Sequence, residues 1–196
     1  ELCQRSVGAT GVSLPANPAL AAASSGEVIT FFTAWTGALD YTSQLYFDFS
    51  CYSYMAIGIG MLFGIRLPLN FLSPYKASNI IDFWRRWHIS LSTWFRDYLY
   101  IPLGGSRVPK AKAILNIFIV FLVSGFWHGA NWTFIVWGGI HAALFIPIFL
   151  IGKNRAHWHE GEHLIPSIRE AFQMVSTFAL VCIAWVFFRA DTVGDA

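Results

Sequence analysis

The sequence predicts an all-α protein, a polytopic bundle of membrane helices with one amphipathic helix at the membrane surface. Hydrophobic residues make up 56% of the 196 residues and charged residues 12%, whereas about a quarter of the residues in soluble domains are charged. Residues 113–152 contain no Lys, Arg, Asp or Glu. That stretch can cross a bilayer twice, because about 20 apolar residues span a hydrocarbon core of roughly 30 Å.

The membrane helices follow from the apolar stretches, taken in order. The first 27 residues are rich in Ala, Ser, Pro and Gly, which is typical of a loop. The chain begins with Glu1 and stops at residues 191–196, soon after an apolar stretch, so we expect it to be part of a longer protein. Five stretches are predicted to be membrane helices: residues 28–47, 50–65, 113–128, 132–151 and 171–188.

The segment 66–112 differs from these stretches in charge. It contains eight basic and two acidic residues, a net charge of +6, whereas the rest of the chain carries −4. Basic residues beside membrane helices mark the cytoplasmic side, so we expect this segment there. The membrane helices on both sides of the segment argue against nucleic-acid binding.

An amphipathic helix is predicted between Asn79 and Tyr100 of this segment. Asn79 and Asp82 resemble a capping box at its start, and Gly104-Gly105 supply the stop. Apolar and aromatic residues recur at steps of three and four, on a face that also carries a histidine: Ile80, Trp84, Trp87, His88, Leu91, Trp94, Phe95 and Tyr98. We expect this helix to lie in or near the cytoplasmic interface.

His128 is the strongest candidate for a functional group. It lies between Gly125 and Gly129, whose spacing lets helix backbones approach closely in a membrane. Sixteen helical residues from Lys112 place it about 24 Å along the axis. An ionisable group is costly at that depth, so we expect a neutral imidazole that can accept a proton. The alternative is a histidine that only hydrogen-bonds a neighbouring helix.

Other candidates allow simpler interpretations. His88 is either functional or an ordinary histidine of an interfacial helix. Arg85 and Arg86 contact either lipid headgroups or the phosphates of a nucleotide-bearing substrate. His141, near the middle of its predicted span, is either a second polar group of the same site or a packing residue.

A different class of function is suggested by His159, Glu160 and His163, which match the H-E-x-x-H pattern of zinc peptidases. The pattern lies in a predicted loop with a glycine inside it and Pro166 after it, so we expect no metal there. Three cysteines without Cys-x-x-Cys spacing indicate neither a disulfide framework nor a thiolate zinc site. A zinc metallopeptidase and a non-catalytic membrane scaffold remain the alternatives to an enzyme that uses His128.

Three motifs resemble those of the membrane-bound O-acyltransferase (MBOAT) family, especially its alginate O-acetyltransferase (AlgI) branch. The first runs from Asp82 to Ser92 and continues from Arg96 to Gly105, the second from Phe126 to Phe134, and the third from Trp185 to Ala190. The resemblance extends from about Asp40 to Ala190. Cys51 and Tyr54 stand where related bacterial sequences usually have Gly and Asp.

The resemblance implies a fragment of a larger multi-helix enzyme of the bacterial inner membrane, with a tunnel through it. Such enzymes move an acyl group from a thioester donor to a hydroxyl or a partner protein. The implied donor is acetyl-CoA, with no cofactor, and the implied partners are periplasmic acetyltransferase proteins and a polysaccharide. The family implies that His128 is catalytic and His88 a second important residue. The predicted donor- or substrate-binding residues are Arg85, Arg86, Trp87, Asn131 and Asp48.

Overall fold

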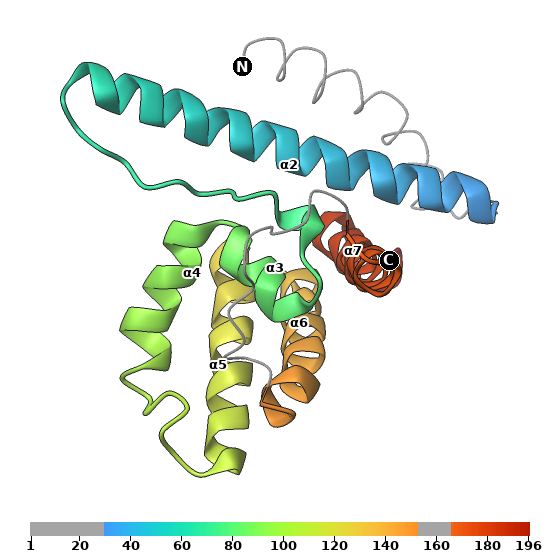
Figure 1. Ribbon diagram of the computed structural model, residues 1–196. Coiled ribbons are helices and arrows are strands. Elements are labelled where there is room, and N and C mark those ends of the chain that lie inside the picture. Colours follow the sequence, from blue (N-terminus) through green and yellow to red (C-terminus); the bar gives the residue numbers. More distant parts are fainter. Residues whose placement is uncertain (1–29, 153–165) are drawn as a thin grey trace.

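The computed structural model describes residues 30–152 and 166–196, and within these ranges every regular element is helical (Figure 1). The all-α prediction is therefore confirmed. The elements are α2 (Phe31–Leu62), a 3-10 turn (Pro74–Lys76), α3 (Ile80–Arg86), α4 (Ile89–Phe95), a π-helical turn (Arg96–Tyr100), α5 (Lys110–His128), α6 (Trp132–Leu150) and α7 (Ile168–Arg189).

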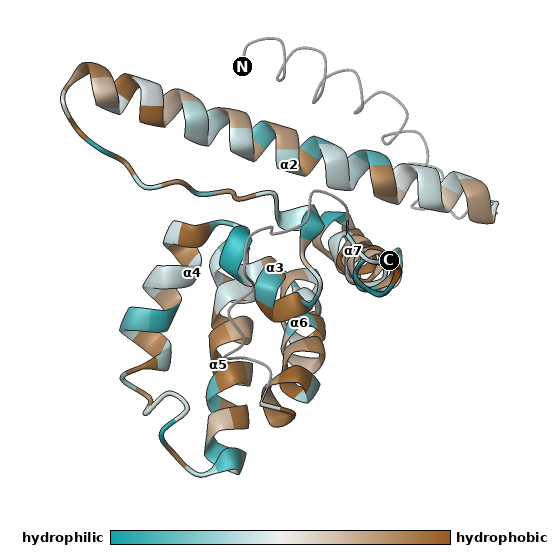
Figure 2. Cartoon of the chain, in the orientation of Figure 1, coloured by the Kyte–Doolittle hydropathy of each residue, from teal (hydrophilic) through white to brown (hydrophobic). Residues whose placement is uncertain are grey.

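Helices α5, α6 and α7 are long and apolar enough to cross a membrane. They occupy the last three stretches predicted from the sequence, although α5 and α7 each begin three residues earlier than expected. Figure 2 shows hydrophobic residues along most of α5 and α6 and hydrophilic ones at the start of α5. The predicted N-terminal loop and the zinc-like histidine pattern lie outside the described residues.

Helices α5 and α6 form an antiparallel hairpin that two glycines hold tightly together. A Cβ atom on Gly125 would overlap the backbone carbonyl oxygen of Phe134, and one on Gly138 would overlap that of Phe121. The contact is reciprocal, because each helix gives one glycine to the backbone of the other. The close approach expected at Gly125 is therefore present, since only a residue without a side chain fits there.

Helix α2 corrects the first part of the prediction. Residues 28–47 and 50–65 were expected to form two helices, but α2 is one continuous helix of 32 residues. No Gly or Pro occurs between Ala38 and Ile57, and the polar side chains bond within the helix, as Thr42 Oγ1 does to the Ala38 carbonyl at 2.7 Å. In Figure 1, α2 lies across the end of the α5–α6 pair, and it contacts α7.

The single amphipathic helix predicted from Asn79 to Tyr100 is also wrong. Its start is confirmed, because Asn79 Oδ1 accepts the Asp82 N–H at 2.9 Å. The helix nevertheless ends at Arg86, and His88 adopts a left-handed backbone conformation with φ 44° and ψ 56°. Helix α4 and the π-helical turn then run alongside α5 (Figure 1).

The break at His88 is stabilised by an extended segment that precedes α3. The Leu72 N–H donates to the Arg86 carbonyl, and the Ile89 N–H donates to the Asn70 carbonyl, both at 3.0 Å. Asn70 Oδ1 also accepts hydrogen bonds from the N–H of Ser90 at 3.1 Å and from its hydroxyl at 2.6 Å. These partners satisfy the backbone groups that the break would leave free, so the chain can turn here without Gly or Pro.

The consequence is that residues 66–112 do not lie along one membrane surface. His88 directly follows Trp87, and ring contacts from Trp87 to Trp185, from Trp185 to Phe188 and from Phe188 to His128 place it toward the His128 end of α5. At the other end of the segment, the carbonyls of Leu103 and Gly105 both accept from Asn116 Nδ2 at 3.2 Å, near the start of α5. Helical periodicity reveals which face of a segment is apolar, but it does not reveal how deeply the segment is buried in the helix bundle.

The largest core cluster lies where α3 meets α6 and α7. Its buried members come from all three helices and from the chain just before them: Phe71, Ala77, Ile80, Ile81, Phe83, Trp87, Trp137, Val181, Ala184 and Trp185. Since this core includes Trp137, which contacts His128, it links the segment 66–112 to the end of α5.

Candidate active site

His128 is the last residue of α5 and lies at the end of that helix opposite Lys110. Its half-buried imidazole meets the edges or faces of three aromatic rings, with centroids 4.9 Å away for Trp127, 5.3 Å for Trp137 and 5.0 Å for Phe188. Among the described residues, none makes a hydrogen bond to this imidazole. The aromatic rings restrict the orientation of the imidazole.

His88 contributes a second imidazole at the same end of α5. Its Nδ1 atom is buried and has no hydrogen-bond partner in the described part of the chain. Burial lowers the pKa of His88, so the neutral form predominates at pH 7. Its ring contacts Phe49 of α2 at 6.1 Å and Phe71 at 6.3 Å. The structure thus places two of the candidate histidines, 40 residues apart in the sequence, at the same end of α5.

His141 has a different environment, although it is also buried. It is 0% exposed, and its ring is stacked on Phe83 and Phe121. Its Nδ1 atom accepts a hydrogen bond from the indole Nε1–H of Trp84 at 3.3 Å. A nitrogen that accepts this bond carries no proton, so the proton of the neutral ring is on Nε2. His141 cannot take up another proton while this bond lasts, which leaves His128 and His88 as candidates for a base.

Comparison with known proteins agrees with this reading of the motifs. A model of the MBOAT, membrane-bound O-acyltransferase family, matches residues 21–186. The chain belongs to the membrane-bound O-acyltransferase family. Its matched range contains all three histidines just described, so they are part of the shared family domain.

Several MBOAT relatives are similar over most of the chain. It is 49% identical to the peptidoglycan O-acetyltransferase of Helicobacter pylori over 168 residues, which is 86% of the chain and 31% of the relative. It is also 49% identical to the probable alginate O-acetylase AlgI of Pseudomonas aeruginosa, over 83% of the chain and 30% of the relative. The teichoic acid D-alanyltransferase of Bacillus subtilis is 35% identical over 76% of the chain and 39% of its own length. The chain thus spans about three tenths of the first two relatives.

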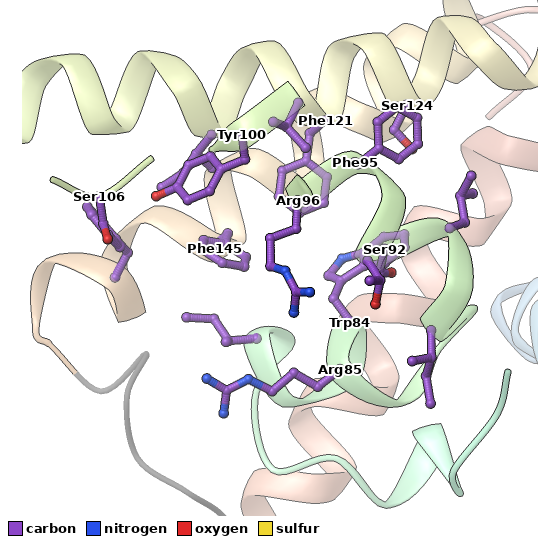
Figure 3. A pocket seen from close by; sticks show the side chains of 17 residues that line it. Trp84, Arg85, Ser92, Phe95, Arg96, Tyr100, Ser106, Phe121, Ser124 and Phe145 are labelled. Carbon is purple, nitrogen blue, oxygen red and sulfur yellow. The ribbon is translucent and has the colours of Figure 1, made fainter. Parts of the chain in front are cut away.

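Arg85 and Arg86, which are adjacent in the first MBOAT motif, have different surroundings. Arg86 Nε pairs with Asp82 Oδ1 at 2.9 Å, and its Nη1 donates to the Leu72 carbonyl at 3.4 Å. The bond to Leu72 joins α3 to the extended segment. Arg85 instead lines a cavity between α3–α4 and α5–α6 (Figure 3). Phosphate binding by either arginine stays a prediction.

The other predicted binding residues lie apart from one another. Trp87 is 5% exposed and belongs to the core. Asn131 caps α6 by accepting the Thr133 N–H at 3.2 Å, and its Nδ2 donates to the Asp191 carbonyl at 3.0 Å. Asp48 is exposed on α2. Their part in substrate binding stays a prediction, but Trp87 and Asn131 have evident structural roles.

The cavity that Arg85 lines has a volume of about 470 Å³. Figure 3 shows the guanidinium groups of Arg85 and Arg96 and the hydroxyl of Ser92 among the lining side chains, together with the rings of Trp84 and Phe121. Arg96 also forms a bidentate ion pair with Asp97, from Nε to Oδ1 at 2.7 Å and from Nη2 to Oδ2 at 3.2 Å. The described lining includes none of the three histidines. Polar groups beside apolar walls suit a ligand with both kinds of surface.

Sequence reasoning missed the residues that shape the surroundings of the histidines. Asn70 supports the break at His88, while Trp137 and Phe188 flank His128. Asn70 gave no signal, because its partners lie 19 and 20 residues away. Phe188 falls within the third motif, which was available as a signal. In the described residues, no group of three or more His, Cys, Asp and Glu side chains could hold a metal ion.

Proposed function

We propose that the full-length protein is an O-acyltransferase of the bacterial inner membrane. It transfers acetyl from acetyl-CoA for the O-acetylation of an exopolysaccharide such as alginate, together with periplasmic acetyltransferase proteins. The family supports the reaction class, and the AlgI relatives support acetyl as the transferred group and alginate as the acceptor. The membrane-length helices α5, α6 and α7 support the location.

The observation that carries this proposal is the imidazole of His128, which is ringed by aromatic side chains and makes no hydrogen bond to the described residues. A neutral imidazole in this setting is a general base. His128 takes the proton of an acceptor hydroxyl while the hydroxyl oxygen attacks the thioester carbonyl carbon. The carbon–sulfur bond then breaks, and the departing thiolate takes the proton back from His128. The products are an O-acetyl ester and a free thiol.

A second acceptor is supported as well as alginate. The peptidoglycan O-acetyltransferase of Helicobacter pylori matches the chain with the same 49% identity as the AlgI of Pseudomonas aeruginosa. Acetyl transfer is common to both names, whereas the polysaccharide differs. Analysis of ester-linked acetate on purified exopolysaccharide and on purified peptidoglycan, from cells with and without the gene, distinguishes the two acceptors.

The test is His128→Ala in the full-length protein. A positioned base contributes about 10²- to 10⁴-fold, so transfer of radiolabelled acetyl from acetyl-CoA in membrane vesicles should fall by at least about a hundredfold. Val123→Ala is the control, because it shortens a side chain that is 41% exposed on the same helix. Both variants should give the same amount of folded protein on size-exclusion chromatography.

Retained transfer in a well-folded His128→Ala variant would contradict the assignment of the base. Unchanged chemistry accompanied by lower stability would instead support a scaffold role for His128. His88→Ala should reduce transfer less, because His88 lies beside the first imidazole and has a supporting position in the fold. An equal loss in both variants would show that the two histidines act as one unit.

A further inference from the structure

Trp84 and His141 are joined by a buried hydrogen bond between two helices that lie far apart in the sequence. The indole Nε1–H of Trp84, on α3, donates to Nδ1 of His141, on α6, at 3.3 Å. Their rings also meet edge to face, with centroids 5.0 Å apart. The bond therefore attaches the short helix that precedes His88 to the membrane helix that follows His128.

The burial of His141 shows that this bond is its main polar interaction. The side chain is 0% exposed, and Nε2 has no partner in the described residues. Because both nitrogens are buried within this part of the fold, the rest of the longer protein has no direct access to them. A leucine would fill much of the same apolar space without leaving an N–H unpaired. What histidine adds at this position is the acceptor for Trp84.

Trp84 occupies a position that makes its orientation important. One side of the indole lines the cavity that also holds Arg85 and Ser92 (Figure 3). Its ring also contacts Trp137 edge to face at 5.8 Å, and Trp137 contacts His128 at 5.3 Å. The indole is thus a wall between the cavity and the rings that orient His128. If the indole turned, it would change both the cavity and the packing against Trp137.

We propose that His141 is a positioning residue for the acyl transfer proposed above. It holds the Trp84 indole in place by accepting its hydrogen bond, and it takes no part in proton transfer. The inference rests on the proposed function, because the positioned wall matters through its contact with the rings around His128. It predicts that an uncharged acceptor can replace the imidazole, whereas an apolar side chain cannot.

The experiment compares His141→Asn with His141→Leu in the full-length protein. An asparagine Oδ1 occupies nearly the place of a histidine Nδ1, so His141→Asn should retain acetyl transfer within about threefold of the unmodified protein, with the same pH profile. His141→Leu should lose about 10- to 100-fold, since small displacements remote from the reacting atoms have effects of that size. Trp84→Phe removes the N–H donor of the bond. Because Trp84 is less buried than His141, this variant should cause the same loss of transfer with little change in the thermal unfolding midpoint. It provides the test if His141→Leu fails to fold.

The outcomes separate this inference from the proposed function. Equal losses in His141→Asn and His141→Leu, with a changed pH profile, would overturn the positioning role in favour of proton transfer by His141. Full activity in both His141→Leu and Trp84→Phe would overturn it because the bond would be dispensable. A Trp84→Phe loss that adds fully to the His141→Leu loss would overturn the shared pathway. Loss of transfer in His128→Ala confirms the base independently, and retained transfer there would refute the proposed function alone.

Discussion

Gly138→Ala tests the close contact between α5 and α6, on which the position of His128 depends. A Cβ atom at Gly138 would overlap the carbonyl oxygen of Phe121 and lie 3.0 Å from its carbonyl carbon. Carbon atoms pack at about 3.5–4.0 Å, so the helices must separate by roughly 0.5–1 Å. Overpacking of this kind costs about 1–3 kcal/mol, partly offset by the roughly 1 kcal/mol that alanine gains over glycine in a helix.

The neighbouring residue gives a matched control, because a Cβ atom on Gly139 meets nothing within 4 Å. Gly139→Ala keeps only the gain in helix propensity, so the difference between the two variants isolates the packing cost of about 1–3 kcal/mol. The measurement is the thermal unfolding midpoint of each full-length variant in detergent micelles. Gly138→Ala should unfold several degrees lower and transfer acetyl more slowly. Equal midpoints for the two variants would refute the close backbone contact.

Two further predictions concern His88 and its support. Asn70→Ala removes both side-chain hydrogen bonds to Ser90 and should lower the free energy of unfolding by about 1–3 kcal/mol. The control is Ser53→Ala, which removes only one long bond of 3.4 Å from Asn70 and should cost little. Equal unfolding midpoints for the two variants would contradict the support role of Asn70. Burial lowers the pKa of His88 in the folded protein below the value of 6.5 that it has in the unfolded chain. Between these two pKa values the unfolded chain binds a proton that the folded protein does not, so the free energy of unfolding falls as the pH drops through this range. His88→Gln should flatten this decline in unfolding midpoints measured from pH 7.5 to 5, and an unchanged slope would show that other groups cause it.

The parts of the fold that the sequence predicted are those with local causes. Helices α5, α6 and α7 follow from apolar length, and the start of α3 follows from Asn79, which bonds to the residue three places on. The continuity of α2 was missed because residues 28–47 and 50–65 were each predicted to be a separate helix. Polar side chains that bond to their own helix do not break it, and no Gly or Pro was present to do so.

The break at His88 and the role of His141 had no local cause to detect. The chain turns at His88 because Asn70 binds the residues that follow, and His141 is occupied because Trp84, 57 residues earlier, donates to it. His128 could be singled out, since a histidine within an uncharged stretch is costly wherever the rest of the fold lies. The proximity of His88 to His128 required the tertiary structure.

The left-handed conformation of His88 is the least expected feature of this site, and its energetics explain why it persists. A residue with a side chain in that region costs about 1–3 kcal/mol. Asn70 makes three hydrogen bonds across the break, one through its backbone and two through its side chain, each worth about 0.5–1.5 kcal/mol. The two amounts are comparable, so the hydrogen bonds of Asn70 offset much of the cost of the strained turn. A regular helix through His88 would carry the chain onward in the direction of α3, whereas the turn sends α4 along α5 and leaves His88 beside His128. The strain at His88 is therefore the structural condition for bringing the two imidazoles together.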